Sequence, residues 1–183
     1  MENARELGVK IRSKRIEKKL SLKELATLID KTPSFLSQVE RGLAEPSITS
    51  LRKIANALEV PIFYFLLNPE EHNPVVRRKQ RKILSFPGYS LTFELLSPNL
   101  NQQMEMIQGR LKPGAATCDK PLTHLGEECT VVLAGTMEIQ VGSEKYTLTE
   151  GDCIYYFASI PHKITNIGSD ELVFISSITP PNF

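Results

Sequence analysis

The spacing of apolar residues changes once along this chain, and that change limits the possible fold more than any other feature. Over residues 7–67 apolar residues recur at intervals of three and four, the period of helices buried on one face. From residue 83 they form short runs rich in Val, Ile, Thr, Tyr and Phe, broken by Gly and by Pro-Gly pairs. The pattern predicts an α + β chain of two domains, with an all-α domain of about five helices over 1–67 and an all-β domain over 83–183.

Residues 68–82 lie between the two patterns, and they are polar and Pro-containing at first and then strongly basic, as is typical of a linker. The charge divides at the same place. Residues 1–82 contain 17 Lys and Arg against 10 Asp and Glu, a net charge of +7, whereas residues 83–183 contain 5 against 11, a net charge of −6. We therefore expect the first domain, and not the second, to bind a polyanion.

Composition disfavours membrane and secreted proteins. The longest apolar run, at 62–67, is far shorter than the roughly 20 residues that cross a bilayer, and the first residues lack the apolar segment of a secretory signal. The three cysteines, Cys118, Cys129 and Cys153, are far apart and form no CxxC pair, so neither a disulfide framework nor a zinc knuckle is indicated. We expect a cytoplasmic protein that does not bind membranes and whose thiols are free and packed.

Start signals for helices stand out in the first half. Ser21 and Glu24 have the spacing of a capping box, and Thr32 can cap a helix that begins at Pro33, where the missing N–H costs nothing. These signals predict helices over about 22–29 and 33–41. Two helices joined by a turn of three or four residues within a small helical domain form a helix-turn-helix.

The helix predicted over 33–41 has two unlike faces. Its inner face is apolar apart from Glu40, a carboxylate that is expensive to bury without a partner. In the first helix Arg15 follows two apolar residues at steps of four, so it also points inward. We expect Arg15 and Glu40 to form a structural ion pair. The outer face carries hydrogen-bonding side chains, namely Ser34, Ser37, Gln38 and Arg41.

These features resemble the phage-repressor type of helix-turn-helix, the XRE family of bacterial regulators. The resemblance covers about residues 7–67 and lies in the segments Ile11-Arg-Ser-Lys-Arg15, Ser21-Leu-Lys-Glu-Leu-Ala26, Ser34-Phe-Leu-Ser-Gln-Val-Glu-Arg-Gly42 and Pro46-Ser-Ile-Thr-Ser-Leu-Arg-Lys-Ile-Ala55. It implies that Gln38 matches the base-reading Gln of the family and that Arg15 and Glu40 match its buried pair. The DNA-binding residues that it implies are Lys23, Thr32, Ser34, Phe35, Ser37, Gln38 and Arg41. The turn has Asp30 where many members have Gly, a change that Asp tolerates at modest cost.

The second half concentrates its chemistry in His124, Glu128 and His162. Two imidazoles and a carboxylate are the ligands of a facial triad, which holds Fe(II) and leaves positions open for a substrate. Glu128 begins one predicted strand and His162 begins another, so both side chains can point into one cavity. Side chains inside a barrel that hydrogen-bond to their neighbours or to an organic ligand would explain the same residues, so no cofactor is assigned with certainty.

This half resembles the cupin fold, a small jelly-roll barrel, over about residues 85–180. The first cupin motif is matched by His124, Glu128 and Gly135, and the second by Gly151, His162 and Asn166. The chain departs from the pattern at Leu122, which replaces the first His of the family's H-x-H pair, and at 158–160, where the family often has Pro and Gly. The resemblance implies a three-ligand site for a divalent metal (Fe, Zn, Ni or Mn). Small barrels can also hold one small ligand, and we expect Arg110, Thr130 and Asn166 to line such an effector pocket.

Three functions fit these observations. The first is a sequence-specific DNA-binding transcriptional regulator, a homodimer on double-stranded DNA whose cupin barrel senses a small-molecule effector. The second is a mononuclear non-haem iron enzyme, similar to an epoxidase or oxygenase, in which the helical domain has become structural. The third is a DNA-binding protein whose barrel serves only dimerisation. The polar outer face of the helix over 33–41 and the charge of +7 favour the first over the second.

Overall fold

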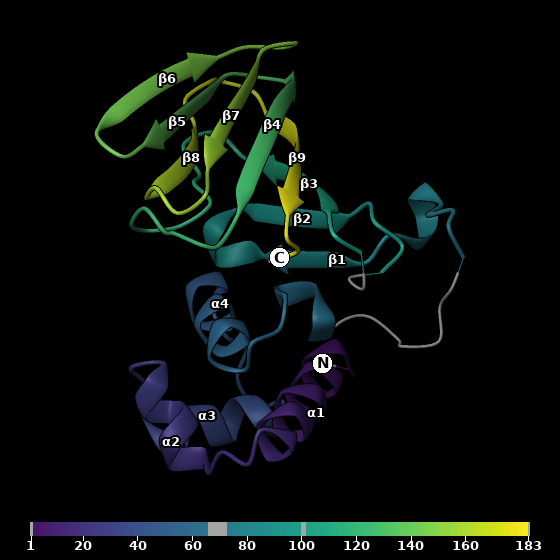
Figure 1. Cartoon of the computed structure of the whole chain (residues 1–183), viewed down its shortest axis with the longest axis vertical. Helices are drawn as coiled ribbons and strands as arrows, with labels where there is room; N and C mark the ends of the chain where they lie inside the picture. Colours follow the sequence, from purple (N-terminus) through teal and green to yellow (C-terminus); the bar gives the residue numbers. More distant parts are fainter. Residues whose placement is uncertain (1, 66–72, 100–101, 183) are drawn as a thin grey trace. The chain divides into compact units, whose positions relative to one another are not determined.

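The computed structural model describes residues 2–65, 73–99 and 102–182. It comprises two compact units, Met1–Leu67 and Asn68–Phe183, of which the first is helical and the second is built of strands (Figure 1). The predicted α + β fold class is thereby confirmed. Residues 68–72 of the predicted linker lie outside the described residues. The rest of that segment contains the 3₁₀ helix η2 (Arg78–Gln80), and Arg81 donates from Nη1 to a carboxylate oxygen of Glu94 at 3.0 Å.

In the helical unit, α2 and α3 begin at the residues where the sequence predicts helix caps. Its elements are α1 (Glu2–Glu17), α2 (Leu22–Leu28), α3 (Pro33–Glu40), α4 (Ile48–Ala57) and the 3₁₀ helix η1 (Ile62–Phe65). Ser21 and Glu24 satisfy each other's backbone N–H groups at the start of α2, at 3.1 and 2.7 Å, as a capping box requires. Thr32 Oγ1 accepts from the Phe35 backbone N–H at 3.1 Å and so caps α3. Asp30, in the turn between α2 and α3, has a φ of +53°, the left-handed conformation that Asp adopts at modest cost.

An ion pair joins α1 to the last turn of α3. Arg15 donates from Nε to Glu40 Oε1 at 2.6 Å and from Nη2 to Glu40 Oε2 at 2.9 Å, while its Nη1 donates to the Leu20 carbonyl at 2.9 Å. The side chains are only 11% and 4% exposed, and hydrogen bonding to Glu40 raises the pKa of Arg15 further above its ordinary value. Gly8 allows the two helices to approach, because a Cβ there would lie 2.4 Å from the Val39 carbonyl oxygen. The pair therefore satisfies both charges at the interface between α1 and α3.

The second unit consists of two antiparallel sheets (Figure 1). The larger has the order β1-β2-β3-β9-β4-β7, and the smaller has the order β6-β5-β8. Their strands in chain order are β1 (Ile83–Phe86), β2 (Leu91–Leu95), β3 (Glu105–Leu111), β4 (Glu127–Ala134), β5 (Met137–Val141), β6 (Glu144–Leu148), β7 (Cys153–Phe157), β8 (His162–Asn166) and β9 (Leu172–Thr179). A further 3₁₀ helix, η3 (Pro87–Tyr89), connects β1 to β2. This is the sandwich of short antiparallel strands that the second half predicts.

Alternation along each strand places one set of side chains between the two sheets. In β9, for example, Leu172, Phe174, Ser176 and Ile178 are buried, whereas the residues between them are half-buried. Gly109 on β3 faces the same interior opposite Phe174, and a Cβ there would lie 2.1 Å from the Phe174 ring. The ring therefore lies across the glycine backbone and fills the space that a side chain would take.

The expectation that all three cysteines are packed is wrong for two of them. Cys118 is buried, but Cys129 and Cys153 are exposed. Both lie at the strand positions of β4 and β7 that alternate outward, since their neighbours Glu128, Thr130 and Tyr156 on the same strands are buried. None of the helices in the described ranges combines the length and the apolar character that a bilayer span requires.

Glu40→Ala is predicted to destabilise the helical unit by about 3 kcal/mol, because it leaves the Arg15 guanidinium buried without its partner. The measurement is urea unfolding followed by far-ultraviolet circular dichroism. Glu17→Ala is the matched control, since Glu17 pairs with Lys14 but is 63% exposed, and it should change the free energy of unfolding by less than about 0.5 kcal/mol. Equal effects of the two substitutions would contradict the structural role of the buried pair.

Candidate functional site

The outer face of α3 is polar and open to solvent. Ser34, Gln38 and Arg41 are exposed and Ser37 is half-buried, whereas Leu36, Val39 and Glu40 on the opposite face are buried. Arg41 is the C-cap residue of the helix, and its Nε donates to the Ser37 carbonyl at 3.2 Å. We call the surface of Ser34, Ser37, Gln38 and Arg41 the α3 outer face. It presents an amide, two hydroxyls and a guanidinium from one short, capped helix.

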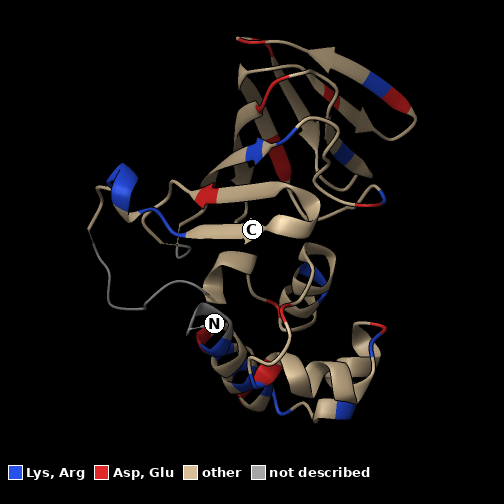
Figure 2. Ribbon diagram, turned by 180° about the vertical axis from the view of Figure 1, so that it is seen from behind, with Lys and Arg blue, Asp and Glu red and all other residues tan. Residues whose placement is uncertain are grey.

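The other predicted DNA-binding residues lie at the start of α3 or on α2. Thr32 is exposed and its hydroxyl oxygen is engaged in capping, while the half-buried Phe35 has the ammonium of Lys31 5.6 Å from its ring centroid. Lys23 is exposed on α2. Lys and Arg also recur along α1 in the same unit (Figure 2). Some of these cations, however, pair with carboxylates inside the unit, such as Lys14 with Glu17 at 2.7 Å.

Between the two sheets, the structure brings together the three predicted metal ligands. His124 Nε2 lies 3.5 Å and His162 Nε2 lies 3.9 Å from Glu128 Oε2, and one potential ligand atom from each residue falls within 4.8 Å of the other two. His124 precedes β4, Glu128 lies on β4, and His162 begins β8 of the other sheet. All three are buried. We call this cluster the triad.

The Nδ1 atom of each imidazole is held by a backbone carbonyl, and this contact fixes the tautomer and the orientation of the ring. His124 Nδ1 lies 3.1 Å from the Leu125 carbonyl oxygen, and His162 Nδ1 lies 2.9 Å from the Ile160 carbonyl oxygen. A carbonyl can only accept, so each Nδ1 must carry the proton, and in a neutral ring Nε2 then has the free lone pair. Both lone pairs are directed toward the Glu128 carboxylate. An arrangement in which each outer nitrogen is fixed by a carbonyl is the one that supports metal-ligating histidines.

Glu128 keeps its charge in this setting. Burial by itself would raise the pKa of the carboxyl group, but the adjacent imidazoles of His124 and His162 and a hydrogen bond from Ser176 lower the pKa below its ordinary value. Thr130 donates to Glu128 Oε1 at 3.1 Å and lies 2.6 Å from the Ser176 hydroxyl. The carboxylate is thus both ionised and held in position.

The donor set of the triad fits a divalent metal ion. His124 Nε2 is buried and has no hydrogen-bond partner, although it lies near the Glu128 carboxylate. Lone pairs from two imidazoles and a carboxylate that converge without a donor between them repel one another unless a cation or a proton lies among them. A metal held there would have coordination positions left for a ligand atom, since Leu122 offers no fourth side-chain ligand.

Two of the three predicted effector-pocket residues have other roles. The side chain of Arg110 lies on the outer face of its sheet, where it donates to Glu94 at 3.3 Å and to Glu171 at 2.9 Å. It alternates with Gly109 and Leu111, which face the interior, so it cannot reach the triad. Asn166 is buried, but its amide donates to the Leu111 and Asp170 carbonyls at 2.9 and 2.8 Å and closes a loop. Thr130 lies beside the triad.

Two further residues at this site were not predicted from the sequence. Ser176 contacts Thr130 from β9, and the Tyr156 ring centroid lies 5.0 Å from that of His162. The run Tyr155-Tyr156-Phe157 ends β7. It is divided by strand alternation, since Tyr155 and Phe157 are exposed and Tyr156 is buried. That alternation was visible in the sequence, but the partner of Tyr156 was not.

Comparison with known proteins agrees with this two-part architecture. Residues 11–65 match the family model described as helix-turn-helix, and residues 108–178 match the model described as cupin domain. Two proteins of Escherichia coli are similar over nearly their whole length. The HTH-type transcriptional regulator PuuR is 26% identical over 96% of each chain, and the HTH-type transcriptional regulator SutR is 29% identical over 99% of each chain.

A solved structure has the same fold throughout. The HTH_3 family transcriptional regulator from Vibrio cholerae superimposes with a TM-score of 0.78, covers 98% of this chain and 97% of its own, and is 24% identical. Both domains, and their order along the chain, therefore recur in a second protein.

The triad is predicted to bind one Co²⁺ per chain after treatment with a chelator, with an absorption spectrum that reports ligation by the imidazoles. His124→Ala should weaken binding at least about tenfold, because one of three ligands is lost. His72→Ala is the matched control, since His72 is the one histidine outside the triad. Unchanged Co²⁺ affinity in His124→Ala would exclude the triad as the metal site.

Proposed function

We propose that this chain, in which a helix-turn-helix domain precedes a cupin domain, is a sequence-specific DNA-binding transcriptional regulator whose barrel senses a small molecule. The observation that carries the proposal is the α3 outer face, an exposed set of hydrogen-bonding side chains on the second helix of the helix-turn-helix. The regulators PuuR and SutR, which align with the chain over nearly its full length, support the same conclusion. Such a protein acts where the DNA is, in the cytoplasm.

The α3 outer face has the chemistry to read base edges. A glutamine amide can donate to adenine N7 and accept from adenine N6, and an arginine can donate to guanine O6 and N7. Each such contact favours the correct base over another by about 1–3 kcal/mol. Gln38 and Arg41 are the residues of these types on α3. Ser34, Ser37, Thr32 and Lys23 have donors suited to phosphate contacts that fix the helix in the groove, and Phe35 offers an apolar ring to a thymine methyl group.

We further propose that the protein binds as a homodimer joined through the barrels. A single recognition helix contacts only a few base pairs, whereas two copies on half-sites about 34 Å apart double the contact and explain why such sites are palindromic. An effector in the barrel would then act by changing the spacing of the two headpieces. A coupling free energy of about 1–3 kcal/mol is enough to alter DNA occupancy several-fold.

The triad favours a second candidate function, an iron-dependent enzyme, because its ligand set leaves coordination positions open. In a sensor, the same open coordination positions would allow an effector to bind the metal without being converted. The full-length relatives are regulators, which supports sensing over catalysis. The two differ in outcome, since an enzyme converts its ligand and a sensor releases it unchanged while DNA affinity shifts.

Gln38→Ala is predicted to weaken binding to the protein's own promoter region about tenfold and to reduce the preference over unrelated DNA, as expected for the loss of one base contact. Fluorescence anisotropy over a series of salt concentrations measures both quantities, and the salt dependence should be nearly unchanged because no phosphate contact is removed. Asn56→Ala removes an exposed amide from α4 and serves as the control. A wild-type protein that binds all DNA equally, or equal losses in both variants, would contradict the proposal.

A further inference from the structure

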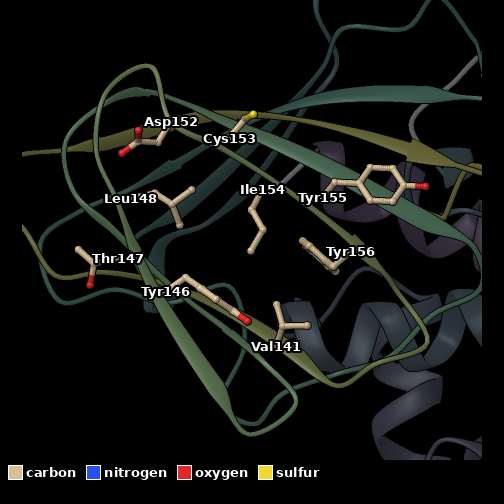
Figure 3. Close-up of a pocket in the computed structure, with 9 residues that line it drawn as sticks. All are labelled: Val141, Tyr146, Thr147, Leu148, Asp152, Cys153, Ile154, Tyr155 and Tyr156. Carbon is tan, nitrogen blue, oxygen red and sulfur yellow. The ribbon is translucent and has the colours of Figure 1, made fainter.

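The two sheets of the barrel are open along one side. β6 and β7 are the end strands of their sheets, and a cavity of about 550 Å³ lies where they face each other (Figure 3). Its volume falls within the roughly 300–1,000 Å³ of small-molecule sites. The cavity is lined by Val141, Tyr146, Thr147, Leu148, Asp152, Cys153, Ile154, Tyr155 and Tyr156.

The strand register places one wall of this cavity on the faces of the sheets that point inward, while Cys153 and Tyr155, which alternate outward, line its solvent side. Tyr146 pairs with Ile139 and Leu148 pairs with Met137, both of which are fully buried, so Tyr146 and Leu148 lie on the inner face of their sheet. Ile154 on β7 is opposite Thr130, which is also fully buried. Yet Tyr146 is 47% exposed. An inward-facing tyrosine reaches solvent here because, among the described residues, no strand pairs with the outer edge of β6 or β7.

The same register connects the cavity to the triad. Tyr156 is the cross-strand partner of Glu128, and Val141 is the cross-strand partner of His162. Directly opposed residues on one face have Cβ atoms about 5 Å apart. The Tyr156 ring also contacts the His162 ring, with 5.0 Å between centroids. Two residues of the cavity wall are therefore immediate neighbours of two triad residues, and Tyr156 both lines the cavity and contacts the triad.

The lining indicates the kind of molecule that fits. Val141, Leu148 and Ile154 are aliphatic, and Tyr146 and Tyr156 add aromatic rings. The lining, which lies entirely within the described residues, includes no Lys or Arg to neutralise an anion. Its one carboxylate, Asp152, accepts hydrogen bonds from Thr149 N at 2.8 Å and Thr149 Oγ1 at 3.0 Å, so it is engaged in the turn before β7.

We propose that the gap between β6 and β7 is the entrance by which an uncharged small molecule, with an apolar ring or chain and one hydrogen-bonding end, reaches the triad past Tyr156. The apolar part lies against Val141, Leu148 and Ile154, and the polar end points to His162 and Glu128. The inference rests on the proposed function, because it locates the uptake of the effector that the regulator senses.

Three probes of equal size test the site and its charge preference, namely benzyl alcohol, benzylamine and benzoate. Binding to the full-length chain is measured by ligand-observed NMR titration. Benzyl alcohol should bind saturably and at least tenfold more tightly than either charged probe. Absence of saturable binding, or a preference for benzoate or benzylamine, would overturn the inference.

Two substitutions locate the bound probe. Ile154→Trp fills the cavity and should weaken benzyl alcohol binding at least tenfold, and Tyr146→Ala, at an exposed position, should weaken it about threefold by removing one wall. Leu133→Trp places the same bulky ring on the outer face of β4, at a side chain that is 41% exposed, and should bind like the wild type. Unchanged binding in both cavity variants would overturn the proposed location.

The failure of this inference is distinguishable from the failure of the proposed function. Gln38→Ala should bind benzyl alcohol like the wild type while losing DNA affinity. A chain that recognises its promoter but does not take up benzyl alcohol leaves the regulator intact and removes this entrance. A chain that takes up the probe but has no DNA sequence preference removes the regulator instead.

Discussion

The bidentate ion pair between Arg15 and Glu40 is the interaction on which the α3 outer face depends. α3 has eight residues, too few to be stable in isolation, so its orientation comes from what holds its inner face. Leu36 and Val39 supply apolar burial, but apolar contacts are not directional. The guanidinium ties the last turn of α3 to α1 with two directed hydrogen bonds. The α3 outer face can therefore remain polar and exposed.

In the barrel, the corresponding constraint is the cost of burying polar groups. Glu128, Thr130 and Ser176 lie inside a mainly apolar sandwich and satisfy one another, and the two imidazoles turn their protonated nitrogens to backbone carbonyls. The groups that point to the centre of the triad are therefore acceptors, namely the two imidazole Nε2 atoms and the Glu128 carboxylate. A site of this kind holds a cation or contacts a ligand, which is why the same geometry suits both a sensor and an enzyme.

Much of the helical unit could be predicted from sequence because its signals are local. The capping box of Ser21 and Glu24 and the cap at Thr32 join residues three positions apart, and helical periodicity brought Arg15 to the inner face. The triad residues could be proposed from spacing and family resemblance. The place of Arg110 could not, because Glu94 and Glu171 meet it from other strands and loops, and the cavity beside Tyr156 left no pattern in the sequence at all.

By itself, the sequence determined the change from helices to strands, the division of charge between the halves and the ends of the short helices, since each depends on composition or on residues within one turn. Only the tertiary structure decided which polar side chains meet. Thr130 and Ser176 are 46 positions apart, and Tyr156 lies opposite Glu128 through strand register alone. Alternation within a strand indicates which side chains share a face, but which residues oppose one another is fixed only when strands that are distant in the sequence pair.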